Sequence, residues 1–331
     1  MLEPASGDLE ELTNLTSVTY VAAPDPYLYF GAMQGVFRVK LTEGAEAKPE
    51  YVTLGWREPT ALIRDEADLV VGLSTGELFT VPLGGPASQT RAIGRVEGGV
   101  RNIVRRTHGD RALYAGSERG LFRKDGNEWQ RPTLGGDQVD LSGGVGWLFE
   151  DPLIPGPLLM QVRPPAKSGI VEISEKNEAR AITRPIQSYH SMFIDVDSAH
   201  LYAPTAADKE FHITAIGLAL NLDARMARQL SMAIAPSAPQ TIYIGVDCCG
   251  VQVVTRTGFR WEAKKTKSSG GAVRSLVVHP TNDKMVFIST DTAILRSTDS
   301  GESWAPLYQS KVAPLRKLAS PPGFGMVLPS Q

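Results

Sequence analysis

The 331-residue sequence has little cysteine, no long apolar run and no excess of basic residues. Its two cysteines, Cys248 and Cys249, are adjacent, so they cannot supply a framework of disulfides. No stretch approaches the roughly 18 apolar residues that a transmembrane helix needs, and we therefore expect no membrane span. The formal net charge is −2. Because nucleic-acid-binding domains usually carry a basic excess, we also expect no nucleic-acid partner.

Signals for targeting and for cofactors are missing as well. Residues 1–11 are acidic and lack an apolar run, which argues against a secretory signal and makes a cytoplasmic location the simplest expectation. The histidines show no metal-ligand spacing, and no nucleotide fingerprint, phosphate loop or nucleophile–base motif is present. We therefore expect no metal and no cofactor.

The sequence instead contains a repeated strand pattern. Apolar residues alternate with polar ones in short segments bounded by Gly, Pro, Asp and Ser, whereas helical periodicity is nearly absent. Each unit predicts two strands joined by a tight turn. The first of these strands ends at a small residue, which we use as a phase marker: Gly31, Gly72, Gly116, Gly245 and Ser289. Glycines in such units supply a positive φ or let one backbone approach another closely.

The spacing of these markers predicts the architecture. Consecutive markers are 41 or 44 residues apart, and the gap of 129 residues after Gly116 equals three periods of 43, so degenerate repeats are expected near residues 160 and 203. Units of about 43 residues are typical of four-stranded propeller blades. The fold class is thus predicted to be all-β, with the approximate blades 15–55, 56–97, 98–141, 142–186, 187–229, 230–268 and 269–310.

The constant phase favours one closed ring over a β-sandwich or a solenoid, and closure also removes exposed sheet edges. We therefore predict a single seven-bladed β-propeller over residues 15–310, preceded by an N-terminal extension at 1–14. Residues 311–331 are expected to complete an edge blade or to form a tail.

One motif is specific. Ser297, Asp299, Gly301 and Trp304 form the pattern Ser-x-Asp-x-Gly-x-x-Trp, with a shortened version at residues 123–129. Asp299 is expected to accept hydrogen bonds from turn amides, and Gly301 to adopt a left-handed conformation. Trp304 is expected to bury one face between neighbouring sheets, with its N–H bonded to a carbonyl.

This motif resembles the Asp-box of the BNR and sortilin-like β-propellers. That family includes sialidases, xyloglucan-cleaving glycosidases, sortilin-type receptors and photosystem assembly factors. In the family the box is structural and lies away from the active face, so the resemblance implies a structural role for the four residues rather than a catalytic one.

Candidate binding residues lie at the end of the ring that we call the loop face. It carries the start of the first strand of each blade and the turn between the second and third strands, and such turns often bind ligands. Three arginines stand fifteen residues before a marker: Arg57, Arg101 and Arg274. Together they could hold a carboxylate, sulfate or phosphate. They could equally pair with neighbouring carboxylates such as Glu58, or point to solvent.

The resemblance bears on these arginines in two ways. Sialidases use an arginine triad for the carboxylate of their substrate, which favours an anionic ligand. However, sialidases are six-bladed propellers and also need an acid and an activated tyrosine, which the sequence does not place.

A second group of candidates follows Gly245. This turn contains Asp247, Cys248 and Cys249 and is one residue longer than its equivalents. The vicinal cysteines could be inert thiols, form a strained disulfide or bind a soft metal.

The segment around Asp247 also resembles the one that carries a catalytic carboxylate in xyloglucan-cleaving glycosidases, with Asp291 as a possible partner. Such cleavage needs two carboxyl groups about 5 to 9.5 Å apart. Those enzymes place their cleft between two propellers, whereas this chain has room for one.

These observations favour a non-enzymatic protein-interaction propeller, a scaffold, sensor or assembly subunit that holds a protein partner on its loop face. The alternative is a glycosidase- or sialidase-like enzyme, or a binder of an anionic or sugar ligand. Residues 91–131, which contain ten Lys or Arg and five Asp or Glu, could dock an acidic partner or simply be solvated. Fold alone does not decide between these functions.

Overall fold

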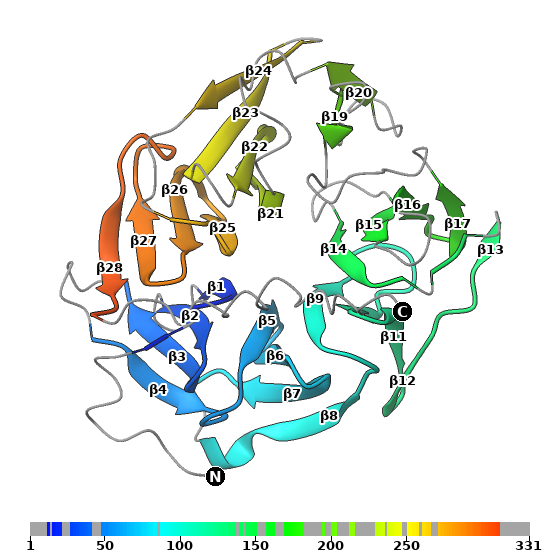
Figure 1. Cartoon of the computed structure of the whole chain (residues 1–331), viewed down its shortest axis with the longest axis horizontal. Coiled ribbons are helices and arrows are strands. Elements are labelled where there is room, and N and C mark those ends of the chain that lie inside the picture. Colours follow the sequence, from blue (N-terminus) through cyan, green and yellow to red (C-terminus); the bar gives the residue numbers. More distant parts are fainter. Residues whose placement is uncertain are drawn as a thin grey trace, which may run out of the picture.

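The computed structural model describes residues 12–13, 15–21, 27–41, 48–84, 87–136, 139–141, 143–150, 157–162, 169–181, 194–195, 200–203, 212–215, 229–235, 237–246, 250–257, 260–265 and 271–311. The regular secondary structure of these residues is β-strand, apart from one short 3-10 helix, η2 (Ala87–Gln89). They form seven sheets, which we number 1 to 7 in chain order. The sheets stand around a common centre, as Figure 1 shows.

The first three sheets each have four strands in sequential order. Sheet 1 contains β1 (Val18–Val21), β2 (Tyr27–Ala32), β3 (Gly35–Lys40) and β4 (Glu50–Thr53). Sheet 2 contains β5 (Pro59–Asp65), β6 (Asp68–Leu73), β7 (Glu77–Pro82) and β8 (Arg91–Arg95). Sheet 3 contains β9 (Val100–Arg105), β10 (Leu113–Ser117), β11 (Gly120–Asp125) and β12 (Glu128–Gln130).

The remaining sheets follow the same antiparallel order with two variations. Sheet 4 contains β14 (Val145–Phe149), β15 (Leu158–Val162), β16 (Gly169–Ile173) and β17 (Glu178–Ala181), and β13 (Gly135–Gly136) joins its outer edge. Sheet 5 is described by three strands, β18 (Ile194–Asp195), β19 (His200–Ala203) and β20 (His212–Ala215). Sheet 6 contains β21 (Gln229–Ala235), β22 (Ala238–Val246), β23 (Gly250–Thr257) and β24 (Arg260–Lys265). Sheet 7 contains β25 (Ser275–His279), β26 (Asn282–Ser289), β27 (Ala293–Ser297) and β28 (Ala305–Gln309).

The middle strands are buried on both faces because each sheet packs between two others. In β6, for example, every residue from Leu69 to Leu73 is buried. One side of this region joins Leu62, Leu69 and Val71 to Tyr29 and Val36 of sheet 1. The opposite side packs against sheet 3. The hydrophobic core is therefore a series of layers between neighbouring sheets, each too thin to tolerate a large change in volume.

The two glycines of the repeat have different functions, as sheet 2 shows. Gly72 lies against the next sheet: a Cβ at this position would lie 2.8 Å from Val100 Cβ, at the start of β9. Gly76, in the following turn, has a φ of 89°, which favours glycine. The marker glycine therefore sets the spacing between sheets, and the second glycine makes the turn.

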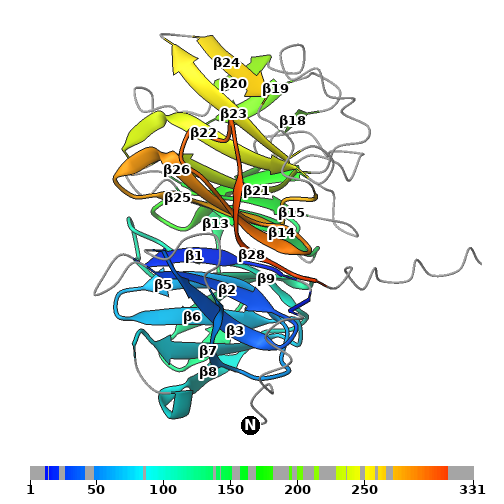
Figure 2. The same ribbon diagram turned by 90° about the vertical axis from the view of Figure 1, so that its left-hand side faces the viewer.

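The first and the last of the described sheets pack together. Leu12, Leu15 and Val18 share one hydrophobic cluster with Phe287 and Tyr308. The backbone N–H of Leu12 donates to Tyr308 Oη at 3.0 Å, and that of Val18 donates to Ser275 Oγ at 3.2 Å. Figure 2 shows the orange and red strands of sheet 7 directly above the blue strands of sheet 1. Sheets 1 and 7 are thus neighbours although they are separated by most of the sequence.

β15 and β19 lie at the positions expected for the two degenerate repeats, near residues 160 and 203. Each predicted repeat contains one sheet, with one correction. The two residues of β13 fall within the repeat predicted for 98–141, yet they pair in parallel with Glu178 and Ala179 of β17. The connection between sheets 3 and 4 is long enough to run along the edge of sheet 4 before β14 begins.

We predict that Gly72→Ala destabilises the protein by about 1 to 3 kcal/mol, because the added methyl group overpacks the layer between sheets 2 and 3. Gly135→Ala is the control, since a Cβ there would meet its nearest neighbour, Glu178 Cγ, at 3.6 Å. Urea unfolding of the two variants and the wild type would measure the effect. Equal midpoints for all three proteins would contradict the proposed role of Gly72 as a spacer.

Candidate functional site

Backbone hydrogen bonds fix the geometry of the loop face. In sheet 2 the N–H of Ser74 donates to Glu58 O at 3.0 Å, and in sheet 3 the N–H of Glu118 donates to Gly99 O at 3.0 Å. In sheet 7 the N–H of Arg274 donates to Ser289 O at 2.8 Å. The residues that precede the first strand of a sheet therefore lie beside the turn between its second and third strands, as the repeat predicted.

Each predicted arginine forms an ion pair across this junction. Arg57 Nη1 lies 3.5 Å from Glu77 Oε1, and Arg101 Nη2 lies 2.7 Å from Glu118 Oε1. Arg274 binds Asp291 with two hydrogen bonds, Nε to Oδ1 at 2.6 Å and Nη2 to Oδ2 at 3.0 Å. The arginine side chains are 41%, 42% and 43% exposed, so these are surface pairs in three equivalent places.

Of the alternatives open for the arginines, the structure shows pairing with a carboxylate of the same sheet. For Arg57 that carboxylate is Glu77, and the suggested Glu58 is wrong. Sequence reasoning missed Glu77 and Glu118. Their signal was the turn itself, since each lies within five residues after a phase marker, as Asp291 does.

Of the second group of candidates, the structure describes Asp291 alone. Asp291 is held by Arg274, so its carboxylate is part of an ion pair on the exposed loop face. Asp247, Cys248 and Cys249 lie outside the described residues, and the proposed pairing of Asp247 with Asp291 stays a prediction.

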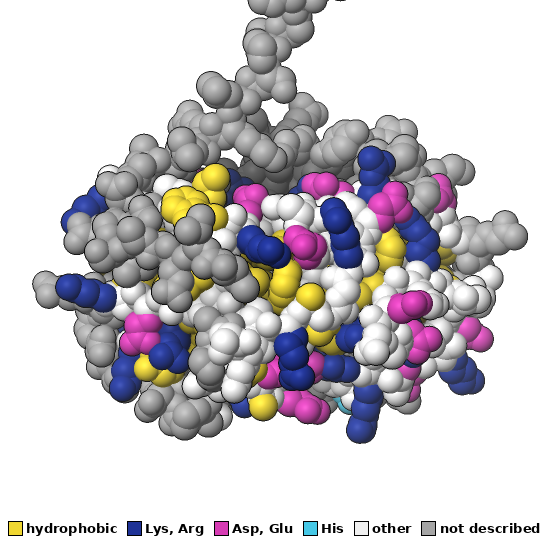
Figure 3. Space-filling view, turned by 90° about the horizontal axis from the view of Figure 1, so that it is seen from below, with side chains coloured by type: hydrophobic (Ala, Val, Ile, Leu, Met, Phe, Trp, Pro, Cys, Tyr) yellow, Lys and Arg dark blue, Asp and Glu magenta, His cyan; other side chains and the backbone are white. Residues whose placement is uncertain are grey.

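Half of the basic side chains of residues 91–131 are ion-paired. Two of these pairs cross to other sheets: Arg105 binds Asp65 of sheet 2, and Arg106 binds Glu150 at the end of β14. The others are Arg101 with Glu118, Arg123 with Asp110 and Arg131 with Glu97. Figure 3, which views the molecule from the side of sheet 2, shows basic and acidic side chains interspersed. The excess of positive charge in this segment is therefore partly neutralised by its neighbours.

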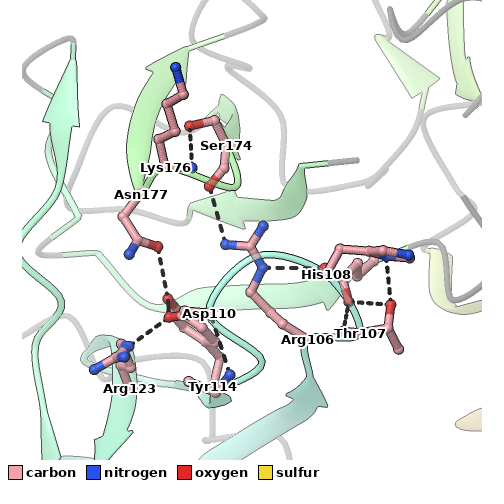
Figure 4. A network of polar contacts seen from close by, with 11 residues as sticks. Arg106, Thr107, His108, Asp110, Tyr114, Arg123, Ser174, Lys176 and Asn177 are labelled. Atoms are coloured by element: carbon pink, nitrogen blue, oxygen red, sulfur yellow. Dashed lines mark hydrogen bonds and ion pairs between the residues drawn. The ribbon is translucent and has the colours of Figure 1, made fainter. Parts of the chain in front are cut away.

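Opposite the loop face, a buried polar network joins sheets 3 and 4 (Figure 4). The side chains of Arg106 and Glu150 are 0% and 2% exposed, and Arg106 Nε lies 3.2 Å from Glu150 Oε1. Arg106 Nη1 donates to Ser174 O at 3.2 Å, and the backbone N–H of Thr107 donates to Glu150 Oε2 at 2.5 Å. Arg106 Nη2 is buried and has no hydrogen-bond partner. A charge buried this deeply is costly unless it is paired. The network therefore favours the observed packing of sheet 3 against sheet 4.

The same network contains Tyr114 and Asp110. Tyr114 Oη donates to Asp110 Oδ2 at 2.9 Å, and Arg123 Nε donates to the same oxygen at 2.8 Å. Burial, reinforced by the negative charge of Asp110, raises the pKa of Tyr114 to about 12. Burial would raise the pKa of Asp110, but hydrogen bonds from Arg123, the Ala112 amide and Tyr114 lower it overall. A tyrosine that resists ionisation is the opposite of an activated nucleophile.

The hairpin around Asp299 adopts the local geometry that its residues predict. Asp299 Oδ1 accepts hydrogen bonds from the Ser303 amide at 2.9 Å and from Ser297 Oγ at 2.8 Å. Ser297 Oγ accepts one from the Gly301 amide at 2.7 Å, and Gly301 has a φ of 87°. The hydrogen bonds from Ser303 and Ser297 lower the pKa of Asp299 to about 2.

The tryptophan of the motif behaves only partly as predicted. Trp304 packs against the core cluster shared by sheets 6 and 7. Its Nε1 is buried without a hydrogen-bond partner, so the predicted bond to a carbonyl is wrong. Trp129, in the shortened version of the motif, does form that bond: its Nε1 donates to Ile93 O at 3.0 Å, across the junction of sheets 2 and 3.

In the part of the chain that the structure describes, no group of three or more His, Cys, Asp and Glu side chains is arranged to hold a metal ion. No described helix is long and apolar enough to cross a membrane.

We predict that Asp299→Ala destabilises the hairpin in a pH-dependent way. The pKa of Asp299 is lower in the folded state, so its contribution to stability is complete above pH 4 and is lost as the pH falls towards 2. The difference in urea midpoint between wild type and variant should therefore be largest at pH 5 and shrink at pH 2.5. A difference that stays constant over this range would show that the charge of Asp299 contributes nothing.

A second prediction concerns the buried ion pair. Arg106→Met should cost about 3 to 5 kcal/mol, because it leaves the charge of Glu150 buried without its partner. Adding Glu150→Gln removes that charge and keeps an acceptor for the Thr107 amide, so the double variant should be more stable than Arg106→Met. The double-mutant cycle in urea at pH 7 measures this coupling, and simple additivity would contradict it.

Comparison with known proteins shows similarity at the level of structure. No protein-family model matches this chain, and no curated protein matches its sequence. The structure superposes on the extracellular domain of BT4673 from B. thetaiotaomicron with a TM-score of 0.60 and 11% identity, covering 89% of this chain and 39% of that one. This chain therefore spans about two fifths of that domain.

Two shorter structures match along nearly their whole length. The WD40 β-propeller domain of Doa1 gives a TM-score of 0.55 at 10% identity, covering 86% of this chain and 92% of that one. YCF48, solved with a D1 peptide, gives 0.57 at 11% identity, covering 87% and 94%. At these identities the similarity concerns the fold alone, and the chain is an all-β protein with the architecture of β-propellers.

Proposed function

We propose that this chain is a non-enzymatic protein-interaction module, a seven-bladed propeller of the Asp-box type over residues 15–310 that holds a protein partner on its loop face. The observation that carries the proposal is the repetition of one exposed ion pair in three sheets. Arg57–Glu77, Arg101–Glu118 and Arg274–Asp291 place alternating charges on one end of the molecule, each with its arginine about two fifths exposed.

Such a surface suits a polypeptide better than a small anion. Each guanidinium already has a carboxylate of its own sheet, so a small anion would have to displace that carboxylate to be bound with two hydrogen bonds. A protein partner carries charges of both signs and can contact arginine and carboxylate together. Complementary charges of this kind mainly set specificity and the rate of association.

The architecture supports the same proposal. Seven sheets that follow the repeat, together with the hydrogen-bonded hairpin around Asp299, support the seven blades and the Asp-box assignment. Among the structures that share the fold, YCF48 was solved with a D1 peptide. Rigid sheets that carry exposed turns are a suitable platform for such contacts.

We predict that the triple variant Arg57→Ala/Arg101→Ala/Arg274→Ala loses a stoichiometric protein partner in affinity capture followed by mass spectrometry. At about 1 kcal/mol for each contact, the loss is more than a hundredfold in affinity. Its fold should be intact, because exposed ion pairs contribute only about 0.2 to 1 kcal/mol each.

The control is Arg38→Ala/Arg105→Ala/Arg180→Ala, which removes the same charge and breaks three other surface ion pairs, with Glu50, Asp65 and Glu172. This control should retain the partner. Equal loss of the partner in both triple variants would show that the effect comes from net charge alone. Absence of any partner for the wild type would reject the proposal in favour of a small anionic or sugar ligand.

A further inference from the structure

Two exposed hydrophobic side chains mark one place on the loop face. Trp56 is 52% exposed and Met33 is 38% exposed, and they are the large hydrophobic residues that the described part of the chain presents to solvent. Trp56 lies between β4 and β5, and Met33 lies in the turn between β2 and β3. The N–H of Trp56 donates to Gln34 O at 3.0 Å, which brings the two segments together. Large apolar side chains exposed together are typical of interaction sites.

The backbone holds Trp56 in a conformation that bulky residues rarely adopt. Trp56 has a φ of 56° and the buried Leu54 has a φ of 60°. Hydrogen bonds maintain this turn: the Gly55 amide donates to Tyr51 Oη at 2.8 Å, and the Arg57 amide donates to Leu54 O at 3.2 Å. The backbone from which the indole projects is thus fixed before any partner arrives, which lowers the entropic cost of binding.

The charges beside Trp56 favour an acidic partner. Of the three loop-face ion pairs, Arg57–Glu77 is the longest, at 3.5 Å, and the Arg57 guanidinium also lies 5.5 Å from the centre of the Phe79 ring. Glu77 Oε2 accepts a hydrogen bond from Thr75 Oγ1, and Arg95 Nη2 donates to Thr75 O at 3.1 Å. Arg95 is the cross-strand neighbour of Glu77, so two guanidinium groups lie around this turn, and neither forms the short double contact seen between Arg274 and Asp291. A carboxylate of a partner can bind here without breaking such a contact.

We propose that Met33, Trp56 and Arg57 form a docking site for an acidic polypeptide segment that carries a bulky apolar side chain. The apolar side chain packs on the indole and the methionine, and the neighbouring carboxylate binds Arg57 and Arg95. This site rests on the proposed function and deepens it, because it assigns the anchor of the partner to sheets 1 and 2. Buried aromatic and arginine side chains are the residues that most often dominate such interfaces.

The test uses the full chain and three pools of fluorescein-labelled synthetic peptides, measured by anisotropy. One pool is acidic with Leu and Phe, the second is acidic with Ser in their place, and the third is basic with Leu and Phe. The first pool should bind best. Trp56→Asn should weaken that binding by about tenfold or more. Arg57→Ala should weaken it as well, and added salt should do the same.

Asparagine tolerates a positive φ, so Trp56→Asn removes the indole without changing the turn, and its melting temperature should equal or exceed that of the wild type. The matched control is Glu66→Asn, an exposed residue with the same φ of 56° in the turn between β5 and β6, away from the loop face. It should bind as the wild type does.

Three results would overturn the proposed site: equal binding of the acidic pools with and without Leu and Phe, unchanged binding by Trp56→Asn, or Trp56-dependent binding of neutral oligosaccharides in place of the peptides. A partner that is captured by Trp56→Asn but lost by the triple arginine variant would reject this site and leave the proposed function standing.

Discussion

Close contact between consecutive sheets is the constraint on which the rest of the structure depends. The second strand of one sheet has, as its last residue but one, a glycine that lies against the start of the next sheet: Gly31 against Pro59, Gly72 against Val100, Gly116 against Val145 and Gly245 against Val273. In sheet 7 the equivalent residue of the repeat is Ser289, whose hydroxyl donates to Thr16 O of sheet 1. One steric requirement thus sets the spacing of the sheets, and it brings the start of each first strand to the same end of the molecule.

The two ends of the molecule use ionic contacts differently. On the loop face the pairs are exposed, lie within a single sheet and contribute little to stability. At the opposite end, Arg106 and Glu150 are buried and cross from one sheet to the next, where loss of one partner is expensive. Because the fold is stabilised elsewhere, the charged side chains of the loop face remain available to bind a partner under the proposed function.

Much of this could be read from the sequence, because the repeat reports the contact between sheets directly. The markers located the strands, including β15 and β19, and they aligned Arg57, Arg101 and Arg274. The partners Glu77 and Glu118 were missed because the repeat locates the turn but does not show which of its side chains reaches the arginine. Trp56 gave no signal either, since a left-handed tryptophan is stabilised by Gln34 and Tyr51, which only the folded chain brings near. The parallel pairing of β13 likewise depends on the path of a connection and not on its composition.

The packing of sheet 1 on sheet 7 has a consequence for biosynthesis. Leu12, Leu15 and Val18 are synthesised long before Phe287 and Tyr308, which complete their cluster. Until those residues are made, one apolar flank of sheet 1 stays open to water and to other nascent chains. A chain that stalls on the ribosome before residue 287 therefore exposes this apolar flank, which favours aggregation.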